Sequence, residues 1–475
     1  MSRHELIFRN CEEEPGRELG SSEGSIPLDL KGTFYRNGPG VFHIGADVVS
    51  FFDAAGIVAG LSFEAGRAYF RARLVESPLL LEERSAGRMM RRRAFTNLPR
   101  GNFLNMRLGN AVMHDAVWFA GRLFATDDGG WFRLDDRTLA TQGEDRLGIA
   151  ARAEKMCPVP RVDERSGRLV TYSVRPSPRG RDSIRLVELD ETFHVVREQT
   201  HTLFNALGLT HEVAFTENYY VVTELAAKLS LPSALIGRKS IWQSIRPTRA
   251  PARIHLVPKV PSAKHRARAF DLPAPVQTLF HVANAFERDD AVVVDAAGYP
   301  WVDFAFTPPE RRARDAAKTR SAGIQRYVLD QRTGAVTSSS FPDAVELPRV
   351  NPSAHGRPYR FIYSVATPSA ECGPDPFVWT NRIAKTDVES RTTATWDAGP
   401  DRWVSQPAFA PRPNPASEDD GYILVWLVNA STQRAEACAL DAKTLSPVCT
   451  VDLGRFLGLA SHARFEPKMS LFPTD

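Results

Sequence analysis

The chain has 475 residues, of which 43% are hydrophobic and 24% charged, so it holds enough apolar material for a large buried core. Its formal net charge of +4 comes from 60 basic and 56 acidic residues, which argues against nucleic acid as a partner. Five cysteines at irregular spacing, with no C-x-x-C pair, indicate neither a disulfide framework nor a zinc site.

Targeting and linker segments are missing from the sequence pattern. The first residues contain no apolar stretch of the secretory type, and no apolar run approaches the ~20 residues that a membrane-spanning helix needs. We therefore expect a cytoplasmic protein that touches membranes at most from outside. No Gly/Ser-rich or Pro-rich linker divides the chain, which predicts a single domain over residues 1–475.

Short segments rich in β-branched and aromatic residues recur along the whole chain. Examples in chain order are "AVWFAGRLFAT", "RLVTYSV", "NYYVVTEL", "AVVVDAAGYPWVDFAF" and "GYILVWLVN". Turn residues separate them, and long helical periodicity is scarce. The pattern predicts an all-β chain of many short strands.

A weak repeat refines this prediction. "LDDRTL" at Leu134, "VDERSG" at Val162, "LDQRTG" at Leu329 and "LDAKTL" at Leu440 each place an aspartate before a basic residue and a hydroxyl residue. An aspartate that caps a tight turn with its own side chain, followed by a hydroxyl residue, is a good hairpin connector. Repeated antiparallel sheets of short strands favour a β-propeller, although the repeat alone does not fix the number of blades.

One excursion interrupts the strand pattern, from Leu225 to Pro247. It combines apolar residues with lysines and arginines, a composition typical of elements that lie on a membrane surface. The same composition also suits a lid that packs on the propeller, and both interpretations stay open.

Three of the eleven histidines stand in comparable settings. His211 in "THEVAFTENYYVV" and His281 in "FHVANAFERDDAVVV" each precede a blade turn, and His462 in "SHARFEP" lies in the last stretch of the chain. The inner strands of a propeller begin near its axis, so these imidazoles are expected to converge. Convergent imidazoles without a cysteine suit Fe(II) or a similar divalent metal.

The chain resembles the carotenoid cleavage oxygenases, a family that includes the retinoid isomerohydrolase of vertebrate eyes and the stilbene-cleaving oxygenases. The resemblance starts at "GTFYRNGPGVF" and "FFDAAGIVAGLSF", continues through "HEVAFTENY" and "HVANAFE", and ends at "PAFAPRPNPASEDDGYILVWLVN". It implies a seven-bladed β-propeller with a helical and loop cap. It also implies Fe(II) on the axis, held by four histidines, and cleavage of an alkene bond in an apolar substrate with O2.

By this resemblance, His211, His281 and His462 match three of the four iron ligands. The first ligand lies in a family motif A-H-P-x-x-D, which reads "CPVPRVD" here, so Val159 stands where that histidine would be. A valine has no lone pair, and the expected site has three histidines. Cys157, two residues earlier, is a weaker candidate for a replacement ligand.

The resemblance also assigns three residues that orient the ligand rings. Asp128 in "ATDDGGW" replaces a family glutamate by a shorter carboxylate, Glu346 in "AVELPRVN" matches the family residue, and Gln406 in "SQPAFAPRP" replaces a glutamate by an uncharged amide. Such acceptors fix the tautomer of a ligand histidine and raise its basicity. These changes predict weaker metal binding.

Three functions are compatible with these residues. The first is a non-haem Fe(II) oxygenase with an atypical three-histidine site, acting with O2 on a carotenoid, apocarotenoid, stilbene or terpenoid. The second is a redox-neutral isomerase, hydrolase or cyclase of a terpenoid or polyene, in which a metal acts as a Lewis acid or is absent. The third is a protein that binds an apolar ligand without catalysis.

Overall fold

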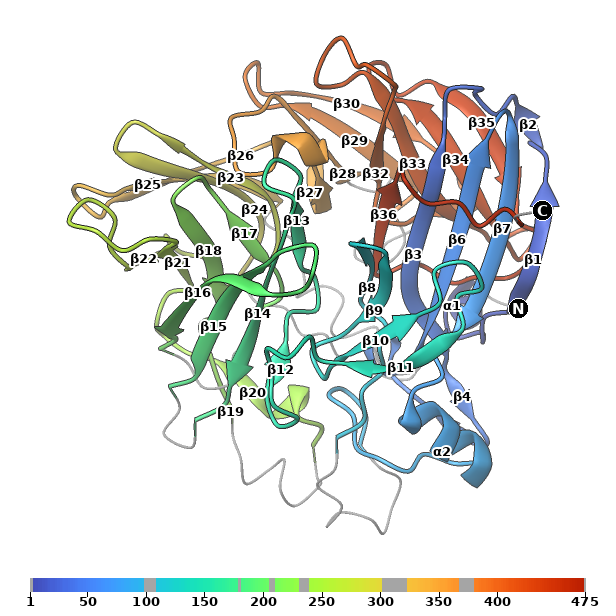
Figure 1. The fold of residues 1–475 in the computed structure, drawn as a ribbon, viewed down its shortest axis with the longest axis horizontal. Helices are drawn as coiled ribbons and strands as arrows, with labels where there is room; N and C mark the ends of the chain where they lie inside the picture. The colour runs from blue at the N-terminus through green and yellow to red at the C-terminus, as the bar shows by residue number, and fades with distance from the viewer. Residues whose placement is uncertain are drawn as a thin grey trace.

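The structure, a computed structural model, describes residues 3–97, 108–177, 181–204, 210–229, 239–300, 323–366 and 380–473. These residues form seven antiparallel sheets arranged as the blades of a β-propeller (Figure 1). The all-β prediction is confirmed, and so is the blade number that the family resemblance implied.

The first blade joins both ends of the chain, because the last strand pairs with β3. In pairing order it contains β1 (Glu14–Leu19), β7 (Arg67–Leu74), β6 (Ala55–Glu64), β3 (Gly32–Val41) and β36 (His462–Glu466). The two termini accordingly lie on the same side of the molecule (Figure 1).

The other six blades follow in chain order. The second contains β8 (Asp115–Phe119), β9 (Arg122–Thr126), β10 (Trp131–Leu134) and β11 (Thr141–Asp145), and the third β12 (Lys155–Met156), β13 (Arg161–Asp163), β14 (Arg168–Arg175), β15 (Ser183–Leu189) and β16 (Val195–Thr202). The fourth contains β17 (Val213–Phe215), β18 (Tyr219–Glu224), β21 (Arg253–Pro258) and β22 (Arg268–Asp271), and the fifth β23 (Thr278–Arg288), β24 (Ala291–Tyr299), β25 (Ile324–Asp330) and β26 (Val336–Ser340). The sixth contains β27 (Ala344–Arg349), β28 (Phe361–Ala366), β29 (Arg382–Asp387) and β30 (Thr392–Asp397), and the seventh β31 (Arg402–Val404), β32 (Ala408–Pro411), β33 (Gly421–Asn429), β34 (Arg434–Asp441), β35 (Pro447–Asp452) and β2 (Glu23–Gly24).

Short elements fill the connections between strands. They are the helices α1 (Arg3–Ile7) and α2 (Pro78–Ala86), the 3-10 helices η1 (Phe51–Asp53), η2 (Trp242–Ser244) and η5 (Pro352–Ala354), and the two-stranded sheets β4 (His43–Ile44) with β5 (Asp47–Val48) and β19 (Ala227–Leu229) with β20 (Ile245–Pro247).

The hydrophobic core lies between neighbouring blades. Buried clusters occupy each of the seven interfaces, and the one between the seventh and first blades closes the ring. In that closing interface, the rings of Phe34 and Trp426 stack with centroids 4.8 Å apart. Each central strand is therefore buried on both faces, and β3, β6 and β33 are buried at nearly every residue.

The four repeated aspartates behave as the sequence predicted. The carboxylates of Asp135, Asp163, Asp330 and Asp441 each accept a hydrogen bond from the backbone N–H two residues on. Each therefore closes a turn between two adjacent strands of one blade. The hairpin prediction is confirmed.

The excursion from Leu225 to Pro247 is described at its two ends. The ends pair as β19 and β20, and Trp242 and Ile245 are buried. The ring of Trp242 lies 5.1 Å from that of Phe95, so this end of the excursion packs inward on the propeller. Residues 230–238 lie outside the described residues.

Candidate metal centre

His211, His281 and His462 lie together at the middle of the propeller, although they come from three different blades. One ligand atom from each ring lies within 4.8 Å of the others. The ring centroids are 4.9 Å apart for His211 and His281, 5.5 Å for His211 and His462, and 5.1 Å for His281 and His462.

Local backbone features aim these rings at one another. The register of β23 shifts around His281, a bulge that re-aims a side chain in a strand. His211 is followed by Glu212, whose buried carboxylate accepts the backbone N–H of Val282 and pairs with Arg161. Glu212 thus ties the strand that follows His211 to the strand that carries His281.

His281 is oriented by a carboxylate. Its Nδ1 lies 2.6 Å from an oxygen of Glu346, the residue that the sequence assigned to this role. The hydroxyl of Tyr299 donates to the other carboxylate oxygen at 2.6 Å. Because Nδ1 donates its proton to Glu346, the lone pair of His281 is left on Nε2.

His462 is oriented by an amide, as the sequence also proposed. Its Nδ1 lies 3.2 Å from Oε1 of Gln406, and this oxygen also accepts the backbone N–H of Ala463 at 3.1 Å. The second contact fixes the amide orientation, so Nδ1 of His462 donates and Nε2 carries the lone pair. A guanidinium nitrogen of Arg349 also lies 3.3 Å from Nδ1, but it cannot accept the Nδ1 proton, whereas the amide oxygen of Gln406 can.

The electrostatics keep two of the three rings, those of His211 and His462, uncharged. Burial, and then the neighbouring His281, lower the pKa values of His211 and His462 well below the usual histidine value. Burial by itself raises the pKa of Glu346, but His281 outweighs this effect and the pKa is lowered. His211 and His462 are therefore neutral imidazoles, and the carboxylate of Glu346 that orients His281 is ionised.

This donor set fits a transition metal. Nε2 of His211 and Nε2 of His462 are 3.3 Å apart. Two nitrogens bound at 2.0–2.1 Å to one tetrahedral metal lie about 3.3–3.4 Å from each other. Imidazole nitrogens suit iron, zinc, copper and nickel, so the donors alone do not select among these metals.

Val159 and Cys157 lie next to this centre without joining the ligand cluster. Val159 is fully buried, and its backbone bridges to Glu212, the residue after His211. Cys157 is part of the apolar cluster between the third and fourth blades, and burial raises the pKa of its thiol to about 12. A thiol held protonated in this way is a poor ligand.

The expected role of Asp128 needs a correction. Its carboxylate pairs with Lys155 at 3.3 Å, and it is the preceding Asp127 that contacts a histidine. An oxygen of Asp127 lies 2.9 Å from Nδ1 of His114, and the ring of His114 lies 5.3 Å from that of His211. Sequence reasoning missed this pair, although "MHDAVWF" has the same form as "THEVAF", a histidine and an acid before an apolar strand.

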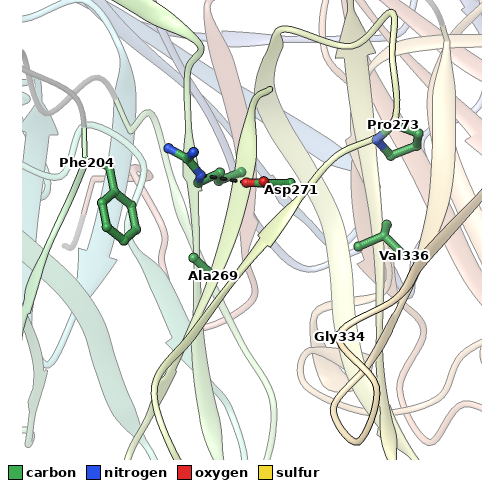
Figure 2. A pocket seen from close by; sticks show the side chains of 7 residues that line it. Phe204, Ala269, Asp271, Pro273, Gly334 and Val336 are labelled. Atoms are coloured by element: carbon green, nitrogen blue, oxygen red, sulfur yellow. Dashed lines mark hydrogen bonds and ion pairs between the residues drawn. The ribbon is translucent and has the colours of Figure 1, made fainter. Parts of the chain in front are cut away.

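A separate hollow lies at the outer edge of the fourth and fifth blades, away from the predicted metal ligands. It has a volume of roughly 480 Å³ and is lined by Phe204, Arg253, Ala269, Asp271, Pro273, Gly334 and Val336. Asp271, labelled in Figure 2, pairs with Arg253 on the adjacent strand at 2.7 Å. Its charged lining is ill suited to an apolar ligand.

The chain is similar to one family of known proteins along nearly its whole length. The family model of the retinal pigment epithelial membrane protein matches residues 8–467. The apocarotenoid-15,15'-oxygenase of Synechocystis is 31% identical over 459 residues, which cover 93% of this chain and 91% of that protein. Isozyme III of the lignostilbene-alpha,beta-dioxygenase of Sphingomonas paucimobilis is 24% identical, over 89% of this chain and 88% of that protein.

A solved structure supports the same relationship. The crystal structure of cobalt-substituted Synechocystis apocarotenoid oxygenase superposes with a TM-score of 0.87 at 28% identity, and covers 97% of this chain and 98% of that one. That relative therefore accepts cobalt as a substitute metal.

Proposed function

Because this chain belongs to the family of the retinal pigment epithelial membrane protein and the carotenoid cleavage dioxygenases, and is a dioxygenase-like enzyme, we propose that it is a non-haem iron(II) oxygenase of an apolar alkene. The substrate would be a carotenoid, apocarotenoid, stilbene or terpenoid. The observation that carries the proposal is the convergence of His211, His281 and His462, with lone pairs on Nε2 of at least two of them.

The residues of the chain have distinct parts in this function. His211, His281 and His462 would hold the iron, and Glu346 and Gln406 keep two of the rings in the tautomer that binds metal. Iron bound there would supply the site at which O2 is activated. Because Val159 cannot bind the metal, the coordination position that the family fills at this point would be available to O2 or substrate.

An apolar substrate suits the surroundings of the histidines. The ring of Phe280 lies 6.0 Å from that of His211. Phe280, Phe52 and Phe95 pack on the same buried cluster, which also includes Trp242. Aromatic walls next to uncharged imidazoles favour a flat, unsaturated ligand over a charged one.

The cellular setting stays a prediction. In the part of the chain that the structure describes, no helix is long and apolar enough to cross a bilayer. We propose a cytoplasmic protein, and place any peripheral membrane contact in the 225–247 excursion. Leu225, Ala227, Trp242 and Ile245 of that excursion are buried and are therefore not available for this contact.

The proposal is tested by turnover under isotopically labelled O2. Protein purified anaerobically and loaded with Fe(II) is given polyene and stilbene substrates, and the products are analysed by mass spectrometry. We expect aldehyde or ketone products that contain oxygen from O2, and none from a His281→Ala variant. Conversion of the substrate without incorporation of labelled oxygen would instead support the redox-neutral isomerase, hydrolase or cyclase.

A further inference from the structure

A fourth histidine stands beside the position where Val159 leaves a ligand missing. The backbone N–H of His114 donates to the carbonyl of Thr126 at 3.1 Å. The hydroxyl of Thr126 donates in turn to the carbonyl of Pro158, the residue before Val159, at 2.5 Å. Thr126 therefore connects the inner end of the second blade, which carries His114, to the segment that carries Val159.

The ring of His114 is as close to His211 as the predicted ligands are to one another. Its centroid lies 5.3 Å from that of His211, within the range of 4.9–5.5 Å found among the three clustered rings. Two imidazoles on one metal, with bond lengths near 2.1 Å and bond angles of 90–110°, have centroids about 4.5–5.3 Å apart. The separation from His211 is thus one that a shared metal allows.

The orientation of His114 also matches that of a ligand. Its Nδ1 lies 2.9 Å from the carboxylate of Asp127, whose side chain is 5% exposed. The backbone N–H of Met113 donates to the same carboxylate oxygen at 3.0 Å. Nδ1 therefore donates to Asp127 and the lone pair of His114 is on Nε2, the arrangement that Glu346 imposes on His281.

The backbone on either side of His114 is fixed to the strand of another ligand. The carboxylate of Asp115 pairs with Arg464 at 2.5 Å, two residues after His462. The side-chain amide of Asn37 donates to the carbonyls of Val112 and Asp115 at 3.0 and 3.1 Å. These contacts hold the inner end of β8, and with it His114, against β36, the strand that begins with His462.

We propose that His114 is the fourth histidine ligand of the metal centre and replaces the one that is absent at position 159. This inference rests on the proposed function, because it requires that a metal binds His211, His281 and His462. The chain then keeps four imidazole ligands but takes one of them from the second blade, and the position beside Val159 stays open to O2 or substrate.

The test uses Co(II), which a structural relative accepts and which reports its ligands spectroscopically. Metal-free wild-type protein and the His114→Gln and Asp127→Asn variants are titrated with Co(II). We expect the Kd to rise on the order of 100-fold for His114→Gln and about 10-fold for Asp127→Asn, by the scale of losses seen around metal sites. His201→Gln is the control, because His201 is also half-buried. Its ring is hydrogen-bonded to that of His255, between the third and fourth blades and away from the metal centre.

The number of ligands is counted in the wild-type protein itself. With histidine labelled in its ring, four of the eleven histidines should show contact-shifted ring resonances in the Co(II) protein, and three in the His114→Gln variant. The double variant Val159→His/His114→Gln should recover the affinity, because it returns the fourth imidazole to the family position.

The outcomes separate this inference from the function on which it rests. Three contact-shifted histidines in the wild type, or an unchanged Kd in a folded His114→Gln variant, would overturn the role of His114 and leave a three-histidine centre intact. A wild-type protein that binds neither Co(II) nor Fe(II) would overturn both the role of His114 and the proposed function.

Discussion

Val159 decides how many imidazoles the third blade contributes to the centre, because an aliphatic side chain has no lone pair to donate. The residue is fully buried, and its backbone forms a bridge with that of Glu212. Because Glu212 directly follows the ligand His211, a histidine at position 159 would lie close to that ligand. The valine therefore keeps a coordination position open where the family has a ligand.

We expect Val159→His to fill that position. The variant should bind Fe(II) on the order of 10–100-fold more tightly, judged by the effect of single groups at metal sites, while turnover of the native substrate falls. Iron content after dialysis and the rate of product formation measure the two effects. Val162→His, on the same segment, is the control. A variant in which iron content and turnover rise together would show that the valine only weakens an ordinary dioxygenase site.

Gln406 sets the basicity of the ligand His462. An amide oxygen accepts the Nδ1 proton at 3.2 Å but carries no charge, whereas the carboxylate of Glu346 carries one behind His281. Arg349, 3.3 Å from Nδ1 of His462, would stabilise a carboxylate at position 406.

The Gln406→Glu substitution should therefore tighten iron binding about 10-fold. The Kd is measured by competition with a chelator of known affinity. Gln433→Glu is the matched control, because Gln433 accepts from Arg9 at 3.3 Å far from the centre and should leave the Kd unchanged. An equal or weaker affinity in Gln406→Glu would contradict the role assigned to this amide.

Between elements, the interfaces of the blades carry the stability of the ring. The stacked pair of Phe34 and Trp426, at 4.8 Å, joins the blade that contains the chain ends to the blade before it. Both side chains are almost completely buried. The large apolar area that they remove from water makes this closing interface sensitive to truncation.

Replacing Trp426 by Ala should lower the free energy of unfolding by about 3–5 kcal/mol, the range for large aromatic truncations in a core. Denaturant unfolding followed by fluorescence and circular dichroism measures the change. Leu28→Ala is the control, since Leu28 is 80% exposed. A loss below about 1 kcal/mol for Trp426→Ala would mean that the closing interface contributes little.

A buried ion cluster links the third and fourth blades. Glu188 on β15 accepts from Arg168 and Arg197 at 2.8 and 2.9 Å, lies 3.4 Å from Lys259, and accepts from the hydroxyl of Tyr220 at 3.1 Å. Burial by itself raises the pKa of Glu188, but Lys259 and the arginines outweigh it and lower the pKa. A carboxyl with a depressed pKa in the folded state stabilises the fold in its ionised form.

Glu188→Gln should accordingly cost about 1–3 kcal/mol of stability at pH 7, the worth of hydrogen bonds to a charged group. The difference from wild type should be complete above the unfolded glutamate pKa of about 4.3 and should shrink as the pH falls through the lower folded value. Denaturation midpoints between pH 3 and 7 measure it. The exposed Glu198, paired with Arg185, gives the control Glu198→Gln. A constant difference over this pH range would show that the charge of Glu188 is not its source.

For the whole molecule, the sequence predicted the features that depend on local pattern, namely the strands and the turns between them. Alternation of apolar strands and aspartate turns indicates many antiparallel hairpins, because each turn is closed by hydrogen bonds within a few residues. The pairing of β3 with β36 is non-local, since it joins residues more than 400 positions apart. The blade number also depends on how strands distant in sequence assemble. The blade number came from the family resemblance, and the pairing of β3 with β36 was not predicted.

The candidate metal centre also has features that the sequence pattern could not predict. Asp127 and Asp128 are adjacent just after β9 and contact different groups, His114 and Lys155, so a one-residue choice decides which carboxylate meets a histidine. The sequence-based choice was Asp128, because the family motif places the acid there. His114 was missed because it is brought close to His211 only by the folding of the second and fourth blades around one axis.

The central claim is that one metal ion binds the three histidines at the middle of the propeller. Anomalous diffraction at the iron edge, from crystals of protein loaded anaerobically with Fe(II), tests it most directly. We predict one strong peak per chain, about 2.0–2.3 Å from a nitrogen of each of His211, His281 and His462. A map without a peak there, or with its peak on other residues, would contradict the account.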